Sequence, residues 1–253
     1  MLSKNKIKHI SSLSRKKERE EVLLFVAEGN KIVTDLLPLF RCRTLIVTEE
    51  FRETLSPCQA EEVITATKEE IKKVSRLSTP QSALAVFYQP EYTVEAASLK
   101  NKFSFMLDTV QDPGNLGTII RIADWFGVEN IICSKETADV YNPKTIQATM
   151  GAIGRVHLHY CDLCDFLDKV PDIPLFGTFL EGKNIYEASL PANGILLMGN
   201  EGKGISSQLE LRITQKLFIP GFPSGRKTSE SLNVAIATAI ACSEFRRRTQ
   251  IIN

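Results

Sequence analysis

Short apolar runs rich in strand-forming residues alternate with helical stretches through the second half of this 253-residue chain. Strands are predicted at 103–107, 130–133, 156–160, 175–179, 195–198 and 216–219. Strands that alternate with helices form a mostly parallel sheet with helices on both faces. The last helix has the clearest pattern, with apolar residues recurring at helical spacing from Leu232 to Ile240. This half is therefore predicted to be an α/β domain.

The first half carries a shorter series of similar signals. Strands are predicted at 22–27, 44–48 and 83–88, with a helix at 31–37 after the first of them. Thr67 and Glu70 form a capping box that opens a helix through Val74. The apolar content falls between residues 89 and 102, as in a connection between domains. A chain of this length suits two domains, which we predict at 1–97 and 98–253.

Composition limits the class of protein. The chain is 43% hydrophobic and 24% charged, as in an ordinary soluble globular protein, which excludes disordered and coiled-coil classes. No apolar stretch approaches the roughly 20 residues that a membrane-spanning helix needs. Residues 1–10 also lack the apolar core of a secretory signal. We therefore expect a cytoplasmic protein without a membrane partner.

The six cysteines are expected to be reduced, since a chain of this size needs no disulfides to fold. Cys161 and Cys164 form a CxxC pair, but no second pair completes a four-ligand zinc site, so no metal is expected. His157 and His159 alternate with other residues along a predicted strand. This spacing places both histidines on one face of the strand.

The 31 basic and 30 acidic residues nearly cancel, yet the basic ones gather toward the two ends of the chain. Lysines and arginines crowd residues 4–19, and Arg246 to Arg248 lie close to the other end. Phosphate groups respond to local clusters of cations more than to the net charge. The clusters indicate either contacts with nucleic acid or solvated helix faces.

A first segment with candidate chemistry spans residues 107–121. The chain leaves a predicted strand, turns at Pro113–Gly114 and enters a helix for which Asn115 is a good N-cap. Arg121 then lies about one and a half turns along the helix. Its guanidinium can hold a phosphate or sugar oxygen, or it can form a surface ion pair with Asp124.

Two further segments also follow predicted strands. Residues 195–205 bring three glycines into a loop, whose backbone can then approach a nucleotide-like ligand closely. Neither a P-loop nor a G-x-G-x-x-G fingerprint matches there. A polar segment runs from Phe218 to Val234, in which Ser229 or Ser231 is the expected N-cap of the last helix. Loops that follow parallel strands meet at the carboxyl edge of the sheet, where open α/β folds bind ligands.

Three stretches now identify a family resemblance: NLGTIIR at 115–121, MGNEGKG at 198–204, and IPG at 219–221 with ESLNV at 230–234. In order and spacing they resemble the signature motifs of the SpoU (TrmH) family of RNA ribose 2′-O-methyltransferases, in the SPOUT superfamily. The resemblance covers the second half of the chain, including residues 148–152. The first half resembles the L30e-like substrate-binding domain that often precedes it, with Phe25–Gly29 in the expected place.

The resemblance implies a SPOUT α/β-knot domain with a deep trefoil knot, a homodimer, an RNA partner and S-adenosylmethionine as cofactor. The catalytic residues that it implies are Asn115, Arg121, Glu201, Ser231 and Asn233. The cofactor-binding residues that it implies are Thr178, Met198, Gly199, Asn200, Gly202, Ile219, Pro220, Gly221, Ser231, Leu232 and Asn233. The RNA contacts that we expect are Lys16, Lys17, Arg19, Arg121, Arg226 and Lys227.

The linker 222–228 is longer and more basic than in many members of the family. It is expected to contact RNA or to close over the cofactor, and a loop insertion without a role is the alternative.

A guanidinium keeps its proton in proteins, so Arg121 is not expected to be a general base. We hypothesise that it grips the phosphate of the target nucleotide and stabilises the attacking 2′-oxygen electrostatically. The L30e-like domain favours ribosomal RNA, 23S rRNA in particular, over transfer RNA. The rival readings are a catalytically silent RNA-binding or ribosome-assembly factor and a related enzyme that methylates a base nitrogen.

Overall fold

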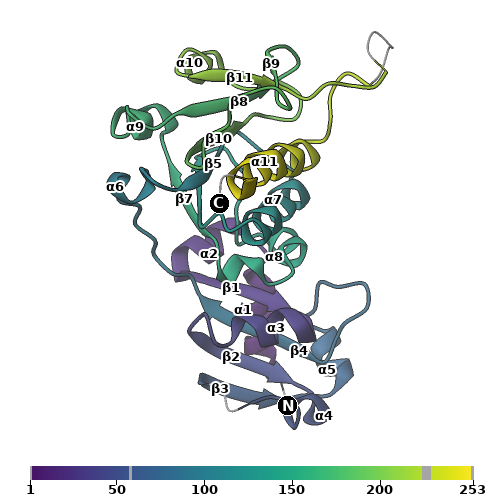
Figure 1. Ribbon diagram of the computed structural model, residues 1–253. Helices are drawn as coiled ribbons and strands as arrows, with labels where there is room; N and C mark the ends of the chain where they lie inside the picture. Colours follow the sequence, from purple (N-terminus) through teal and green to yellow (C-terminus); the bar gives the residue numbers. More distant parts are fainter. Residues whose placement is uncertain (1, 57–58, 224–228, 252–253) are drawn as a thin grey trace. The chain divides into compact units, whose positions relative to one another are not determined.

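The computed structural model (Figure 1) describes residues 2–56, 59–223 and 229–251. Two compact units make up the chain: unit 1 comprises Met1–Glu91 with Asp139–Gly154, and unit 2 comprises Tyr92–Ala138 with Arg155–Asn253. Unit 1 thus takes in a segment that lies between two predicted strands of the second half. The domain limits of 1–97 and 98–253 remain predictions.

Unit 1 is built on a four-stranded sheet with the order β1-β4-β2-β3. Its strands are β1 (Leu24–Glu28), β2 (Cys42–Val47), β3 (Ala60–Thr65) and β4 (Ala83–Tyr88). β4 pairs antiparallel with β1 and β2, and β2 pairs parallel with β3. Three of these strands are predicted from the sequence. β3 is not, because exposed Glu61, Glu62 and Val63 leave it no apolar run at this edge of the sheet.

Helices cover both faces of the sheet in unit 1. On one face, residues of α1 (Lys4–Ser12) and α5 (Lys68–Lys72) form an apolar cluster with alternate residues of the strands. The predicted capping box of Thr67 and Glu70 opens α5 and is confirmed. On the other face, the ring of Phe25 lies 4.9 Å from that of Tyr141 and 5.3 Å from that of Phe40. The remaining helices are α2 (Lys16–Val22), α3 (Asn30–Leu36), α4 (Glu49–Arg52), α8 (Pro143–Thr149) and the 3-10 turn η1 (Ala152–Gly154).

Unit 2 is built on a seven-stranded sheet with the order β7-β6-β5-β10-β8-β11-β9, in which every pair is parallel. Its strands are β5 (Phe103–Leu107), β6 (Asn130–Ser134), β7 (His157–Cys161), β8 (Leu175–Phe179), β9 (Lys183–Asn184), β10 (Gly194–Met198) and β11 (Gln215–Phe218). All six predicted strands are confirmed to within about two residues. β9 is too short to give a sequence signal.

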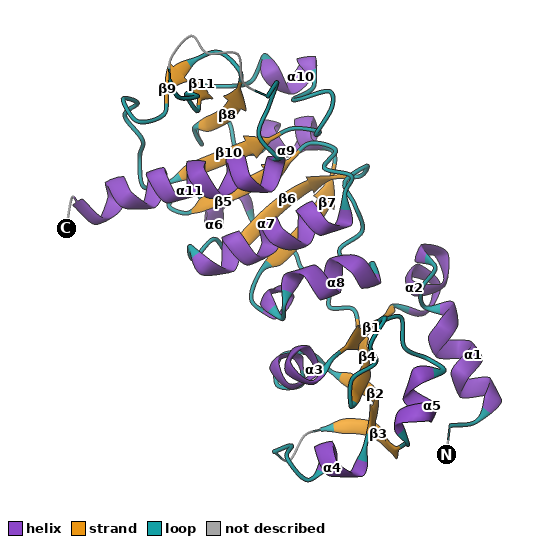
Figure 2. Cartoon of the chain, turned by 90° about the vertical axis from the view of Figure 1, so that its right-hand side faces the viewer, coloured by secondary structure: helices purple, strands orange, loops and turns teal. Residues whose placement is uncertain are grey.

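Helices also cover both faces of the sheet in unit 2, as predicted. Figure 2 shows α7 (Pro113–Trp125) and α11 (Val234–Ile251) side by side on one face. The ring of Phe245 on α11 packs there, 4.5 Å from Phe103 and 5.1 Å from Phe176. On the other face, α6 (Ala96–Leu99), α9 (Leu163–Asp168) and α10 (Ser207–Glu210) share an apolar cluster with strand residues such as Met106 and Leu197.

The histidine pair of β7 confirms the predicted period of two. The ring of Tyr92 stacks on His157 at 4.1 Å and meets His159 edge-on at 6.4 Å, so both histidines share one face. His159 is buried, and its Nε2 lies 3.0 Å from Asn130 Oδ1. Burial lowers the pKa of His159, as expected for an imidazole inside a fold. The five cysteines in the described residues carry free thiols.

Candidate active site

Two loops of unit 2 are joined at the carboxyl edge of its sheet. β5 and β10 are parallel neighbours whose last residues, Leu107 and Met198, are in register. Asp108 is buried directly after β5, and its carboxylate accepts a hydrogen bond from the Ser206 backbone N–H at 2.7 Å. The Asp108 N–H in turn donates to the Met198 carbonyl at 2.9 Å. The loops after β5 and β10 are therefore held together at their bases.

Asn200 organises the loop after β10. Its Oδ1 accepts from the backbone N–H groups of Gly202 and Lys203, both at 3.0 Å, and its Nδ2 donates to the Thr109 carbonyl at 2.8 Å. The backbones of Asn200 and Gly204 exchange two hydrogen bonds of 2.9 Å. One amide side chain thus closes the glycine-rich loop and ties it to the loop after β5.

Gly199 leaves no room for a side chain in this loop. A Cβ there would lie 2.3 Å from the Gly204 carbonyl carbon and 2.4 Å from the Ile205 nitrogen, which are backbone atoms that cannot move alone. We expect Gly199→Ala to lower the free energy of unfolding by about 1–3 kcal/mol through overpacking, measured by urea denaturation. Gly202→Ala is the matched control, since its Cβ would meet only Asn200 Oδ1 at 3.7 Å. Equal stability of the two variants would contradict this account.

Asn115, Glu201 and Asn233 form a hydrogen-bonded chain across three loops. Asn233 Nδ2 donates to Asn115 Oδ1 at 2.9 Å, and Asn115 Nδ2 donates to Glu201 Oε1 at 3.0 Å. Asn233 Oδ1 accepts from backbone N–H groups, so its Nδ2 must face Asn115, and the orientation of both amides follows. Three of the five predicted catalytic side chains are therefore brought together.

The N-cap predicted for α7 is wrong. α7 begins at Pro113 and its N-cap is Asp112, whose Oδ1 accepts from the Asn115 N–H at 2.8 Å. Asp112 and not Asn115 is the N-cap because Pro113 fits the first helical position, where no N–H is needed. The side chain of Asn115, relieved of capping, is available to bridge Asn233 and Glu201.

The N-cap predicted for the last helix is also wrong. α11 begins at Val234, and Asn233 Oδ1 accepts from Ala235 N–H at 2.9 Å and Ile236 N–H at 3.3 Å. The helix therefore begins after Asn233, which leaves both Ser229 and Ser231 outside its first turn. Ser231 and Leu232 are exposed in the segment just before it.

Arg121 lies on α7 but apart from the Asn115 chain. Six residues of an α-helix turn through about 600°, so its side chain points some 120° away from that of Asn115. The alternative ion pair with Asp124 is wrong, because Arg155 Nε and Nη2 bind that carboxylate at 2.8 and 2.7 Å. Arg121 is exposed and has no polar partner among the described residues.

The residues predicted to hold the cofactor begin at the ends of three adjacent strands. β10, β8 and β11 are neighbours, and Thr178 Oγ1 on β8 lies 3.5 Å from the sulfur of Met198 on β10. Ile219, Pro220 and Gly221 follow directly after β11. The sequence therefore places these residues at one edge of the sheet, as expected of loops after parallel strands.

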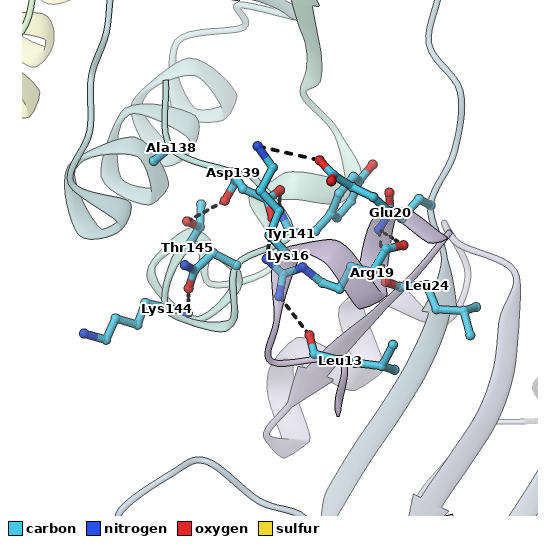
Figure 3. Close-up of polar contacts among 12 residues, drawn as sticks. Leu13, Lys16, Arg19, Glu20, Leu24, Ala138, Asp139, Tyr141, Lys144 and Thr145 are labelled. Atoms are coloured by element: carbon cyan, nitrogen blue, oxygen red, sulfur yellow. Dashed lines mark hydrogen bonds and ion pairs between the residues drawn. The ribbon is translucent and has the colours of Figure 1, made fainter. Parts of the chain in front are cut away.

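The RNA contact predicted at Arg19 is corrected by the structure. Arg19 is only 2% exposed, and its guanidinium donates to the Leu13 carbonyl and pairs with Asp139, all within unit 1 (Figure 3). A basic run cannot reveal that one of its members turns inward to a distant carboxylate. Lys16 pairs with Glu20 at 3.6 Å, and Lys17 is exposed. Arg226 and Lys227 lie outside the described residues.

Sequence reasoning missed Asp108 and Thr109, which support the site. Thr109 has a positive φ of 60°, rare for a β-branched residue, and its N–H donates to Ser134 Oγ at 3.0 Å. Backbone strain of this kind persists where surrounding contacts hold it. The available signal was the position of both residues directly after a predicted buried strand. No three His, Cys, Asp or Glu side chains gather as a metal site in the described ranges.

Comparison with sequence families assigns the chain. The profile of the SpoU rRNA Methylase family matches residues 102–243, and that of the MRM3-like substrate binding domain matches residues 4–85. The chain therefore belongs to the SpoU rRNA methylase family, and the resemblance carried by its motifs is confirmed. The predicted order of a substrate-binding domain followed by an α/β methylase domain is confirmed as well.

Individual relatives and solved structures match this chain over nearly its full length. The 23S rRNA (guanosine(2553)-2′-O)-methyltransferase RlmP of Bacillus subtilis is 31% identical over 247 residues, covering 95% of this chain and 96% of that protein. The structure of a TrmH-family protein from Porphyromonas gingivalis has a TM-score of 0.89 at 42% identity, covering 98% of this chain and 99% of that chain. An AdoMet-bound rRNA methyltransferase from Sinorhizobium meliloti has a TM-score of 0.83 at 31% identity, covering 98% and 96%.

Proposed function

We propose that this protein transfers a methyl group from S-adenosylmethionine to a ribose 2′-hydroxyl of ribosomal RNA. The observation that carries this function is the SpoU family match over the part of the chain that holds the linked Asn115, Glu201 and Asn233. Relatives of the chain are named as 23S rRNA 2′-O-methyltransferases, which favours 23S rRNA over transfer RNA. The same names do not favour a catalytically silent RNA-binding factor.

The edge of the sheet fits S-adenosylmethionine on two counts. Thr178, Met198 and Ile219 lie at or directly after the ends of three adjacent strands. A Cβ at Gly204 would meet no atom within 4 Å, so the backbone of the glycine loop is open to a ligand there. The residues proposed to hold the cofactor are Thr178, Met198 to Gly202, Ile219 to Gly221 and Ser231 to Asn233. When bound, S-adenosylmethionine supplies a methyl group that is already activated for displacement.

The residues of this chain then have to position the ribose and stabilise charge on its 2′-oxygen. Arg121 is exposed and free of polar partners within the described part of the chain, so it is available to a phosphate of the target nucleotide. Because a guanidinium keeps its proton, the proton of the 2′-hydroxyl leaves to phosphate, water or a neighbouring group. Asn115 is held between Glu201 and Asn233, and such fixed geometry contributes to rate through orientation.

Methyl transfer from labelled S-adenosylmethionine to ribosomal RNA of a strain lacking the protein tests this function. We expect label in 23S rRNA, and nuclease digestion followed by mass spectrometry should locate the methyl group on a ribose 2′-oxygen. A methyl group on a base nitrogen would support the rival enzyme reading instead. Label that appears only in protein or small molecules would overturn the proposed function.

Three broader properties are part of the proposal. We place the protein in the cytoplasm, where ribosomal RNA is used. No helix in the described residues is both long and apolar enough to cross a membrane.

A trefoil knot is supported by the insertion of β10 between β5 and β8 and by the hydrogen bond from Asn233 back to Asn115. Arg226 and Lys227 of the linker, and Lys17 of unit 1, remain proposed RNA contacts.

A homodimer is supported by one large apolar side chain on the surface of α7. Trp125 is 85% exposed at the end of this helix. Tryptophan is enriched in protein interfaces, so its exposure favours a protein partner. We expect Trp125→Glu to shift the protein from dimer to monomer in sedimentation velocity at micromolar concentration. Leu211→Glu, at a residue 88% exposed after α10, is the control. A Trp125→Glu protein that stays dimeric would contradict this interface.

A further inference from the structure

The basic residues at the start of the chain divide between two helices of unit 1 with opposite surroundings. α2 carries three glutamates, and of its three basic residues Lys16 pairs with Glu20 and Arg19 is buried. α1 carries three lysines and no carboxylate. Lys4 and Lys8 on α1 are exposed and have no polar partner among the described residues. The surface of α1 is therefore the more strongly positive of the two.

A cavity of about 240 Å³ lies beside α1. Asn5, Lys6 and His9 line it from the helix, and Arg43 and Thr44 line it from β2. A water molecule occupies about 30 Å³ of liquid, so the cavity has room for a phosphate group with its hydration. The lining includes ammonium, guanidinium and amide donors, which is the chemistry of an anion site.

Arg43 is the cation of this lining that forms no hydrogen bond or close ion pair with a described residue, although its charge acts on Glu61 and Glu62. It is the extra residue of a β-bulge in β2, since Cys42 and Thr44 pair with the consecutive residues Phe87 and Val86. A bulge commonly re-aims a side chain. The neighbouring carboxylates are already engaged: Tyr88 and Arg41 bind Glu61, and Lys6 and Thr44 bind Glu62. No described residue pairs with Arg43, which is exposed.

The pKa of His9 responds to the positive charges that line the cavity. Its pKa is lowered, first by burial and then by the positive charges of Arg43 and Lys6, while Glu18 acts in the opposite direction. Its Nε2 is covered and has no hydrogen-bond partner. An anion in the cavity would offset the repulsion that His9 experiences from the two cations.

We propose that the cavity between α1 and β2 binds a phosphate of the RNA backbone, with Arg43 as its charged ligand and Lys6, which is paired with Glu62, beside it. Lys4 and Lys8 are turned by about 160–200° from Lys6 around α1, so they lie on the opposite face of the helix and are not ligands of this cavity. The inference rests on the proposed function, which makes RNA the ligand. It also moves the main RNA contact of unit 1 from α2 to this cavity.

Binding of a fluorescein-labelled oligouridylate to the full chain tests the site without any sequence-specific contact. We expect Arg43→Gln to weaken binding about three- to tenfold at low salt. It should also flatten the plot of log affinity against log salt by about 0.7, the value for one phosphate contact on a single strand. Lys8→Gln is the matched control, because it removes the same charge from the opposite face of α1 and should weaken binding less. Exposed side chains are changed in both variants, so thermal unfolding should be unaltered.

The ring resonances of the three histidines give a second readout in the same protein. The oligouridylate should shift the signal of His9, whereas His157 and His159 serve as internal references. Binding by Arg43→Gln that matches the wild type, or an equal loss in Lys8→Gln, would overturn the site. An unshifted His9 signal would overturn it too. Methyl transfer is assayed separately, so an active enzyme with an unaltered Arg43→Gln variant would refute this inference and leave the proposed function standing.

Discussion

Arg121→Ala is expected to slow methyl transfer to RNA by about 10²–10³-fold, the usual cost of removing one group that stabilises transition-state charge. The guanidinium is exposed on α7 and makes no polar contact in the described part of the chain, so no structural contact is lost with it. Stability and affinity for S-adenosylmethionine should therefore stay at the wild-type level. Single-turnover transfer, calorimetry with the cofactor and a thermal melt measure the three quantities.

The choice of variants separates electrostatics from geometry. Arg121→Lys keeps the charge but loses the planar fork that binds phosphate bidentately, so it should recover only part of the rate. Arg212→Ala is the control, because Arg212 is another exposed arginine of unit 2, paired with Asp168 on the surface. Transfer by Arg121→Ala at the wild-type rate, with normal cofactor binding, would remove Arg121 from the catalytic residues.

The central part of the sheet in unit 2 was predictable because its strands there are buried on both faces. Such strands read as short apolar runs, as at Phe103–Leu107 and Gly194–Met198, which are visible directly in the sequence. β3 was not predicted from the sequence because it lies at the edge of its sheet. Glu61, Glu62 and Val63 are exposed there, so burial does not constrain its sequence. Composition along the chain also cannot show that segment 139–154 clusters with the first ninety or so residues.

The candidate site was predictable as a set of motifs but not as a set of contacts. The linked Asn115, Glu201 and Asn233 all lie in the recognised motifs. The capping residues were misassigned because Asn, Asp and Ser all cap helices well, and the path of the chain decides among them. Sequence patterns do not show contacts between residues far apart in the chain. Arg19 is the clearest example, since its partner Asp139 lies 120 residues away.

Asp139→Ala is expected to lower the free energy of unfolding by about 3–5 kcal/mol, the cost of leaving a buried charge without its partner. Arg19 is 2% exposed, so its Nη2 cannot find water when the carboxylate is removed. Asp139 Oδ1 also accepts from the Tyr141 N–H at 2.9 Å, and that bond would be lost as well. Urea denaturation followed by circular dichroism measures the change. Lys31→Ala, which breaks an exposed pair with Asp35, should cost no more than about 1 kcal/mol.

Replacing Arg19 and replacing Asp139 should lower the free energy of unfolding by different amounts. The side chain of Asp139 is 17% exposed, so Arg19→Met leaves a carboxylate that can reach water and still accept from Tyr141. Arg19→Met also places an apolar side chain of similar length in a buried space, although the bond to the Leu13 carbonyl is lost. We therefore expect Arg19→Met to destabilise unit 1 less than Asp139→Ala. The double variant Arg19→Met, Asp139→Ala should be more stable than Asp139→Ala alone, because it removes the stranded charge. A double variant less stable than Asp139→Ala would show that the ion pair is not the source of the effect.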